Sequence, residues 1–432
     1  MSDSSKFQLS LPDINALFKI KYEKLSENVY NSANVLLGRV KKSYNFTGRK
    51  LQISIPQSFA GGVGSGSLPK ANAARYVAAE IEAKKVYARV DIDRETIKAS
   101  QSSEGAFVRA TKEVVKKGVE SYMRNMSRIL FNDGSGKLGT IDCSASAALS
   151  SQGTEEDPKV VLVAGAKEAD LEEKDLINVG SGNGSETSLF SIEEVEVASD
   201  GTITLTLHRE AGSQNLSTLT ATDTDLDIFM QGSEGNDPMG LKGALKPHAP
   251  GQADLYTVPN GRRWSAEVIS VQSEITAGSR TGNNDISTDI LNEMMLKIKK
   301  KCGKSPNLIV ASFKQYEKIL NMLESEKQYT VNTRAGLKTK SGADISFSGI
   351  EFMSIDGAVG IFPERFVEDD RIYFLNDDHI HIHHRPDFGW FDDDGTVFLR
   401  KAGADEYEAR YGGYLEVYIN PCFHGVLEEL SV

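Results

Sequence analysis

The sequence is poor in cysteine, and it has no long apolar run. Three cysteines among 432 residues (Cys143, Cys302 and Cys422) lie far apart and are odd in number. This pattern excludes a disulfide framework and favours a reducing compartment. No stretch approaches the ~20 consecutive apolar residues of a membrane helix, so we expect no membrane contact. The first residues lack a basic stretch followed by an apolar one, and we therefore expect no secretion signal.

Positive charge is scarce overall but concentrated near one end of the chain. The formal net charge is −12, from 49 Lys and Arg against 61 Asp and Glu, which argues against a protein that coats nucleic acid. Residues 1–140 carry 23 Lys and Arg against 13 Asp and Glu, whereas residues 141–240 carry 4 against 20. Such opposite parts can attract each other between copies, so self-association is a hypothesis beside an accidental surface composition.

Apolar periodicity predicts two long helices and a hairpin in the first part of the chain. One helix runs from about Asp13 to Val40, and the other covers residues 102–131,. Between them, residues 49–92 form two alternating extended runs around the glycine-rich stretch 61–67, with a phase slip that predicts a bend at Lys84–Lys85,. An isolated two-stranded ribbon is marginal in water, so this hairpin needs a surface supplied by something else.

The remaining chain predicts an inserted β module followed by mixed structure. Short apolar runs within residues 155–234, with a turn signal at Ser199-Asp200-Gly201, are typical of strands,. Beyond them, helices over Asp289–Lys301 and Phe313–Glu326 flank a buried strand at Asn307–Ala311, and extended segments dominate the C-terminal part,. The expected fold class is therefore α+β.

Three alternating histidines form the one pattern with plausible enzymatic content. On a strand, His379, His381 and His383 would share one face, and Asp377 or Asp378 could complete a zinc shell of a hydrolase,. Against this hypothesis, the sequence has no His-Glu-x-x-His helix and no cysteine pair,. A partly exposed histidine ladder at a sheet edge is common. We therefore expect no metal and no catalytic residue.

Two glycine-rich stretches resemble phosphate-binding loops without meeting their requirements. The stretch 61–67 follows a strand, but Pro69 and an extended run come next instead of a helix,. The stretch 133–139 has Leu138 where a hydroxyl must reach the metal ion,. Cys302, although it lies among lysines, is interpreted as a helix-end residue without catalytic use,. No cofactor is expected.

The order of these elements resembles that of tailed-bacteriophage major capsid proteins, whose Hong Kong 97-type fold is shared with encapsulins. The matching features are an arm at Asp13–Val40, a glycine-tipped hairpin at 49–92, a spine helix at 102–131 and a helix–strand–helix unit at Asp289–Glu326. The resemblance covers nearly the whole chain and rests on the order of elements.

The resemblance implies a division into five parts. They are an N-terminal arm (1–48), an E-loop hairpin (49–92), a P-domain with the spine helix (93–134 and 376–414), an A-domain (135–154, 235–375 and 415–432) and an inserted small all-β domain (155–234).

The resemblance also implies a function. The chain would be a structural protein that assembles into hexamers and pentamers of an icosahedral phage head enclosing double-stranded DNA. Its partners would be other copies of itself, a portal protein at one vertex, the packaged DNA without sequence-specific contacts, and any separate scaffolding and decoration proteins. It would be made and assembled in the host bacterial cytoplasm and reside in the virion capsid. The alternative is an encapsulin-like protein compartment.

The arm and the hairpin have apolar faces with no cover nearby in the sequence, so we expect them to lie across neighbouring subunits. The residues expected at these contacts are Leu17, Leu25, Val29, Phe59, Leu68, Lys70, Arg75, Lys84, Lys85 and Arg89. The basic residues 1–140 are expected to meet an acidic surface of the next subunit.

Reversing a charge on the hairpin, as in Arg89→Glu, should therefore reduce assembly without unfolding the monomer. The yield of full shells measures the effect. A yield equal to that of the wild type would contradict the electrostatic part of this expectation.

Overall fold

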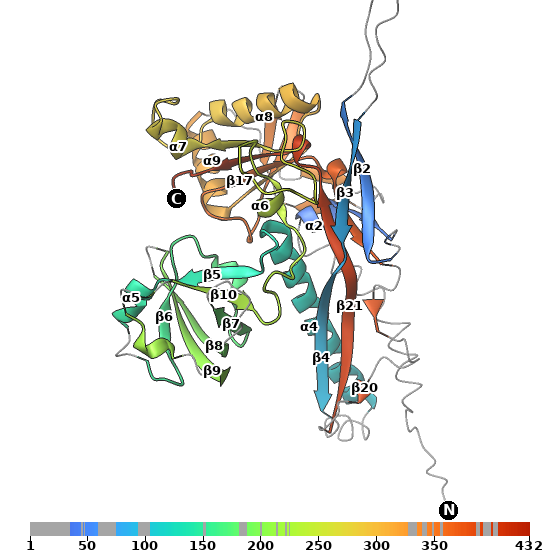
Figure 1. Cartoon of the computed structure of the whole chain (residues 1–432), viewed down its shortest axis with the longest axis vertical. Coiled ribbons are helices and arrows are strands. Elements are labelled where there is room, and N and C mark those ends of the chain that lie inside the picture. The colour runs from blue at the N-terminus through green and yellow to red at the C-terminus, as the bar shows by residue number, and fades with distance from the viewer. Residues whose placement is uncertain are drawn as a thin grey trace, which may run out of the picture.

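The computed structural model describes residues 35–44, 46, 48–58, 75–93, 104–149, 153–180, 188–198, 201–212, 215–220, 223, 225–326, 335–338, 344–347, 350–354, 357–385, 389–391, 399–400 and 405–432. Most of the expected arm helix lies outside these ranges, and its last turn is α2 (Val35–Arg39). The described chain forms a helix-covered sheet, an inserted sheet, a long rod and a projecting hairpin (Figure 1). The expected α+β class is confirmed.

A six-stranded mixed sheet carries α8 (Thr288–Cys302) and α9 (Phe313–Glu326) on one face. In its strand β12 (Leu308–Ala311), Leu308 and Val310 join the main core. Ile309 and Ala311 join the core beneath the two helices, because successive side chains of a strand point to opposite faces,. The helix–strand–helix unit expected here is confirmed. The other strands of this sheet are β11 (Glu267–Ser270), β15 (Ile350–Ser354), β16 (Gly357–Pro363), β17 (Ile372–Leu375) and β22 (Gly425–Glu428).

The rod consists of α4 (Glu104–Phe131), β4 (Lys84–Asp93) and β21 (Glu406–Ile419), which run side by side (Figure 1). The helix confirms the spine expected at 102–131. It approaches β4 so closely that a Cβ at Gly118 would lie 2.3 Å from Val90 Cγ2, so a larger residue at this crossing would have to displace the Val90 side chain. The sheet around β21 is completed by β1 (Lys41–Ser43), β18 (Ile380–His384), β19 (Gly389–Trp390) and β20 (Leu399–Arg400).

The extended run expected at 49–92 divides into two structural units. β2 (Lys50–Ser58) pairs with β3 (Arg75–Glu82), whereas β4 pairs with β21, more than 300 positions away in the sequence. The strands break at Ala83, next to the bend expected at Lys84–Lys85.

The expectation that the hairpin lacks cover within its own subunit is wrong for its base. Ile55, Ala79 and Ile81 are buried in the main core. The backbone N–H of Glu80 also donates to the carbonyl of Tyr256 at 3.0 Å. The base of β2–β3 is therefore anchored in its own subunit.

The acidic part of the chain forms a six-stranded sheet with a hydrophobic core of its own. The strands, in spatial order, are β5 (Lys137–Ile141), β10 (Leu226–Met230), β7 (Leu176–Gly180), β8 (Ser188–Val197), β9 (Ile203–Gly212) and β6 (Lys159–Val161). Because β5 pairs with β10, the sheet includes residues before position 155. The domain boundaries 155–234 stay a prediction.

Several short elements connect these units. They are α5 (Cys143–Ala147), α6 (Leu241–Ala244), α7 (Val271–Thr276), the strand pair β13 (Ala335–Lys338) and β14 (Asp344–Phe347), and the 3₁₀ turns η1 (Glu168–Asp170), η2 (Leu216–Thr218), η3 (Asp377–His379) and η4 (Pro421–Phe423). Within the described ranges, none of the helices is both long and apolar enough to cross a membrane.

Gly412→Ala should loosen the rod. Gly412 has φ 143°, and a Cβ there would lie 2.1 Å from the carbonyl oxygen of Val86 on β4. Backbone strain together with this clash should lower the free energy of unfolding by about 2–3 kcal/mol. Denaturant unfolding of the unassembled chain measures the loss.

Gly303→Ala is the matched control. Gly303 ends α8 with φ 77°, and no atom lies within 4 Å of an added Cβ. This variant should lose only about 1 kcal/mol of unfolding free energy, because the backbone is strained there but no atom clashes with the added Cβ. Equal losses in the two variants would show that the close approach of β4 and β21 contributes nothing.

Candidate assembly surfaces

The inserted sheet joins the body through a neck, which we define as residues 131–136 and 231–240. The central interaction in the neck is an ion pair between Arg128 of α4 and Asp237, 2.9 Å long, whose side chains are only 3 % and 8 % exposed. Removing one partner of a buried pair leaves an uncompensated charge and costs about 3–5 kcal/mol. The pair therefore ties the orientation of the insert to the spine helix.

Two strands of the rod also hold the neck. The Nζ of Lys84, at the start of β4, donates to the carbonyls of Asp237 at 2.5 Å and Gly235 at 3.3 Å. The Oε1 of Glu416 on β21 accepts from the backbone N–H of Met239 at 2.8 Å. The neck is thus bound at once to α4, β4 and β21, although these elements are far apart in the sequence.

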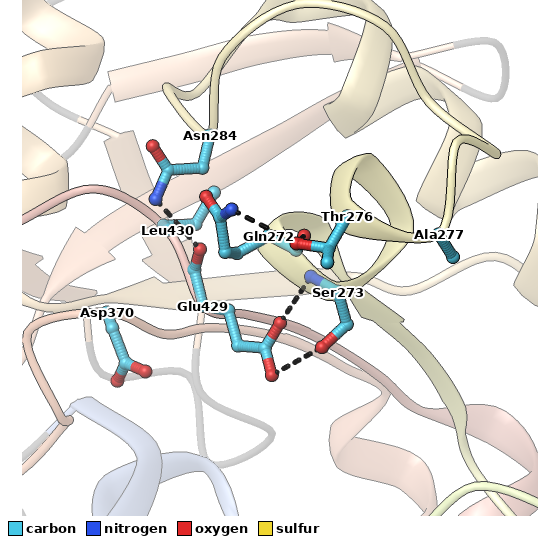
Figure 2. Close-up of a pocket in the computed structure, with 8 residues that line it drawn as sticks. All are labelled: Gln272, Ser273, Thr276, Ala277, Asn284, Asp370, Glu429 and Leu430. Atoms are coloured by element: carbon cyan, nitrogen blue, oxygen red, sulfur yellow. Dashed lines mark hydrogen bonds between the residues drawn. The ribbon is translucent and has the colours of Figure 1, made fainter.

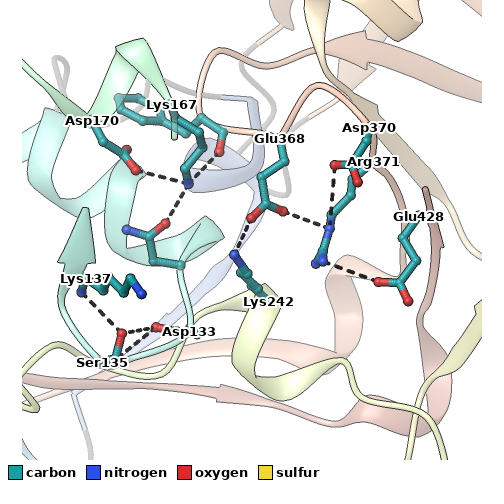
Figure 3. Close-up of polar contacts among 12 residues, drawn as sticks. Asp133, Ser135, Lys137, Lys167, Asp170, Lys242, Glu368, Asp370, Arg371 and Glu428 are labelled. Atoms are coloured by element: carbon teal, nitrogen blue, oxygen red, sulfur yellow. Dashed lines mark hydrogen bonds and ion pairs between the residues drawn. The ribbon is translucent and has the colours of Figure 1, made fainter. Parts of the chain in front are cut away.

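A second polar network connects the insert to the spine and to the region of the sheet that carries α8 and α9, which we call the upper sheet (Figure 3). Lys167 of the insert donates to Asn132 Oδ1 at 2.6 Å and to the carbonyl of Phe366 at 3.2 Å, and it pairs with Asp170 at 3.2 Å. Because Asp170 is buried, its carboxylate requires a compensating positive charge, and the ammonium group of Lys167 provides it,.

The network continues along the upper sheet. Glu368 pairs with Lys242 at 2.5 Å and with Arg371 at 3.0 Å, and Arg371 reaches Glu428 of β22 at 3.4 Å. A cavity of about 180 Å³ lies where the insert, the neck and Glu368 meet. Among its lining residues, Lys167 pairs with Asp170 and Lys242 pairs with Glu368, and these pairs brace the junction.

Basic residues of the spine helix and of β5 pair with acidic residues of the insert inside one subunit. Arg124 pairs with Glu172 at 2.6 Å and with Asp175 at 3.0 Å, and Lys137 pairs with Asp227 at 2.6 Å. The expectation that the basic first part meets an acidic surface of the next subunit is therefore corrected for these residues. Their charges are already compensated within the chain.

Six of the predicted contact residues lie outside the described residues: Leu17, Leu25, Val29, Phe59, Leu68 and Lys70. Arg75 begins β3, and no contact of its side chain is described. These seven positions stay predictions.

The structure places the other three predicted contact residues on β4. Lys84 points into the neck of its own subunit. Lys85 is exposed, with Nζ 5.8 Å from the ring centre of Tyr414. Arg89 pairs with Asp91 at 2.8 Å and with Glu408 at 4.0 Å. Lys85 and Arg89 thus remain available at the surface of the rod.

The histidines of the ladder are engaged by neighbouring groups. His379 ends η3 and stacks on Phe423, with ring centres 3.6 Å apart, while its Nε2 lies 3.3 Å from Lys304 Nζ. His381 and His383 on β18 have ring centres 5.9 Å apart.

The electrostatic surroundings of these histidines oppose a metal ion. Burial, followed by the nearby Lys304, lowers the pKa of His379 to about 4, and burial also lowers the pKa of His383 to about 4. A lysine ammonium beside Nε2 repels a metal cation. In the part of the chain that is described, no three His, Cys, Asp or Glu side chains gather as a metal site.

An open cleft of about 520 Å³ lies beside α7 (Figure 2). Glu429 crosses its floor, and its carboxylate accepts from the backbone N–H of Ser273 at 2.7 Å and from Ser273 Oγ at 2.9 Å. Asn284 Nδ2 donates to the carbonyl of Glu429 at 3.4 Å. These contacts fasten the C-terminal segment to α7.

Comparison with known proteins identifies this architecture. The family model described as SU10 major capsid protein matches residues 212–396. Among solved structures, the capsid asymmetric unit of cyanophage A-1(L) is 11 % identical, covers 92 % of this chain and 93 % of its own, and has a TM-score of 0.50. The holo-SrpI encapsulin complex from Synechococcus elongatus is 10 % identical over 92 % of this chain and 87 % of its own, with a TM-score of 0.44. No curated protein matches the sequence.

The chain therefore has the Hong Kong 97-type capsid fold, the fold that its order of elements resembles. Residues 212–396 are similar to a major capsid protein family, and the solved structure that shares the fold is the capsid subunit of a cyanophage.

Glu416→Gln should change how stability depends on pH. Burial raises the pKa of Glu416 to about 7, against the lowering effects of the Met239 N–H and Lys84. A raised carboxyl pKa stabilises the fold below the ordinary pKa of 4.5, and this contribution is lost as the pH rises through about 7. A glutamine keeps the acceptor for Met239 but does not ionise. The variant should therefore gain roughly 3 kcal/mol over the wild type between pH 5 and pH 8.5.

Denaturant unfolding of both chains across this pH range measures the difference, in which the titration of all other groups cancels. Glu120→Gln, at an exposed position of α4, is the control variant and is unfolded across the same pH range. A difference for Glu416→Gln that does not change with pH would contradict the assignment.

Proposed function

We propose that this chain builds the icosahedral shell of a phage head from hexamers and pentamers, that the shell encloses double-stranded DNA, and that the chain is not an enzyme. The observation that carries the proposal is the half-anchored hairpin β2–β3 (Figure 1). Ile55, Ala79 and Ile81 bury one face of the hairpin, whereas Tyr76 points to the opposite face, because side chains alternate along a strand, and is 63 % exposed,. A hairpin that is held by one face and uncovered on the other presents its open face to another copy.

Repetition makes such a contact effective. A surface of one copy that binds a different surface of the next forms a ring when the rotation closes. Each ring contact is modest, but all contacts of a shell act together, so their combined strength far exceeds that of one pair. The structure supports this with a rigid subunit, since the neck fixes the insert to the rod.

The contacts between copies involve the hairpin and the arm. The hairpin contributes Phe59, Leu68, Lys70 and Arg75, and the arm contributes Leu17, Leu25 and Val29. The strand β4 of the rod contributes the exposed Lys85 and Arg89. The shell is assembled in the bacterial cytoplasm around a portal protein at one vertex, with scaffolding or decoration proteins where the phage encodes them. The DNA is enclosed without sequence-specific contacts.

Negative-stain electron microscopy of the purified chain tests assembly directly. Shells, tubes or hexameric patches are expected. Uniform small particles with hydrolytic activity would instead support an enzyme. Shells that hold a cargo protein in place of nucleic acid would support an encapsulin-like compartment.

Leu68→Asp tests the role of the hairpin. A buried contact between copies would be lost, so the yield of shells should fall at least about tenfold, which corresponds to 1.4 kcal/mol. The control is Leu320→Asp on α9, where the leucine is already 42 % exposed. The prediction fails if both variants assemble equally well.

A further inference from the structure

Four cations gather at the C-terminal end of α8, and we call them the cation patch: Arg262, Arg263, Lys300 and Lys304. All four are exposed, and no carboxylate of the described residues lies within ion-pair distance of them. Lys301 joins the helix end to the segment that carries the two arginines, because its Nζ donates to Ser265 Oγ at 3.0 Å and to the carbonyl of Ala266 at 3.3 Å.

The acids near this patch are already compensated. Lys301 itself pairs with Glu267 at 2.9 Å. Asp378, on the other side of the patch, pairs with Lys41 at 2.8 Å. The patch therefore presents uncompensated positive charge to its surroundings.

The inserted sheet shows the opposite imbalance. Residues 141–240 carry 20 Asp and Glu but only 4 Lys and Arg, and each of these four cations has a partner within the insert. The pairs are Lys159–Glu196, Lys167–Asp170, Lys174–Glu193 and Arg209–Glu155. Four exposed glutamates remain without such a partner, and we call them the acidic surface: Glu156, Glu168, Glu173 and Glu194. Among the residues described, no cation lies within ion-pair distance of them.

The two surfaces belong to different parts of a rigid subunit. The end of α8 lies in the upper part of the molecule, and the insert lies below and to the side (Figure 1). The buried Arg128–Asp237 pair and the contacts of Lys84 and Glu416 hold the neck between them. The acidic surface cannot swing up to its own cation patch while these contacts persist.

We propose that the cation patch of one copy binds the acidic surface of the inserted sheet of a second copy. The proposal rests on the proposed function, and it names a contact within that assembly. Every copy brings both surfaces in equal number, so the contact is heterologous and repeats around a closed ring. A second copy fits better than nucleic acid, because the net charge of −12 repels a polyanion,.

Reciprocal charge reversal tests the contact. The first variant is Arg262→Glu with Arg263→Glu, the second is Glu173→Lys with Glu194→Lys, and the third combines all four changes. The readout is the yield of shells at 0.1 M NaCl by sedimentation and electron microscopy. Each of the first two variants should lose at least about tenfold in yield, because like charges then face each other across the contact. The third variant should recover to within about threefold of the wild type, because attraction is restored with its direction reversed.

Two controls accompany these variants. Lys116→Glu with Lys117→Glu reverses two exposed lysines on α4 and should leave the yield unchanged. All substituted residues are exposed, so the unassembled variants should keep the wild-type melting temperature,. High salt is a further test. At 1 M NaCl the Debye length is ~3 Å, so the charges on the two surfaces are screened and the wild-type chain should assemble as weakly as the first variant.

Three results would overturn the proposal while leaving the proposed function intact. They are a wild-type yield of shells from the first variant, no recovery in the combined variant, and normal shells of the first variant that hold less nucleic acid. The last result would assign the patch to nucleic acid. Failure of the wild-type chain to form any shell, tube or hexamer would overturn the proposed function and this contact together.

Discussion

The buried ion pair between Arg128 and Asp237 is the interaction on which the arrangement of the subunit depends. An inserted domain joined by two crossings of the chain can swing unless its neck is bound. Here the spine helix supplies a guanidinium, and Lys84 and Glu416 add contacts from two strands of the rod. Because charged groups without partners are costly in the interior, the pair fixes one orientation of the neck and disfavours others. A subunit that must repeat one geometry around a shell requires this rigidity.

The separation of charge along the sequence acts in two ways. Much of it is resolved within the subunit, where Arg124 and Lys137 neutralise carboxylates of the insert. The remainder is divided between surfaces that the neck keeps apart, the acidic surface of the insert and the cation patch around Arg263 and Lys304. Surfaces of opposite charge on one rigid body attract copies head to tail, whereas a flexible insert would fold back and cancel them.

Local pattern predicted the elements whose packing is local. The apolar stripe of α4, the helix α8 and the uninterrupted strand β12 were recognisable in the sequence, and a phase slip marked the break beside Lys84. Long-range pairing was not predictable. The sequence does not show that β4 joins β21, so the base of the hairpin was expected to lack cover. The role of Glu416 was not predictable either. The sequence shows only one acidic residue in an apolar strand, and its partner Met239 lies 177 positions away.

Lys84 links the hairpin to the insert. It follows the break between β3 and β4, where the projecting hairpin leaves the rod, and its ammonium holds the carbonyls of Gly235 and Asp237 in the neck. A rotation of β4 about β21 at this point must stretch those hydrogen bonds, so the angle of the hairpin and the orientation of the insert cannot change independently. A neighbour that pulls on the hairpin therefore also acts on the insert. The hairpin and the insert are in this way mechanically joined through one junction.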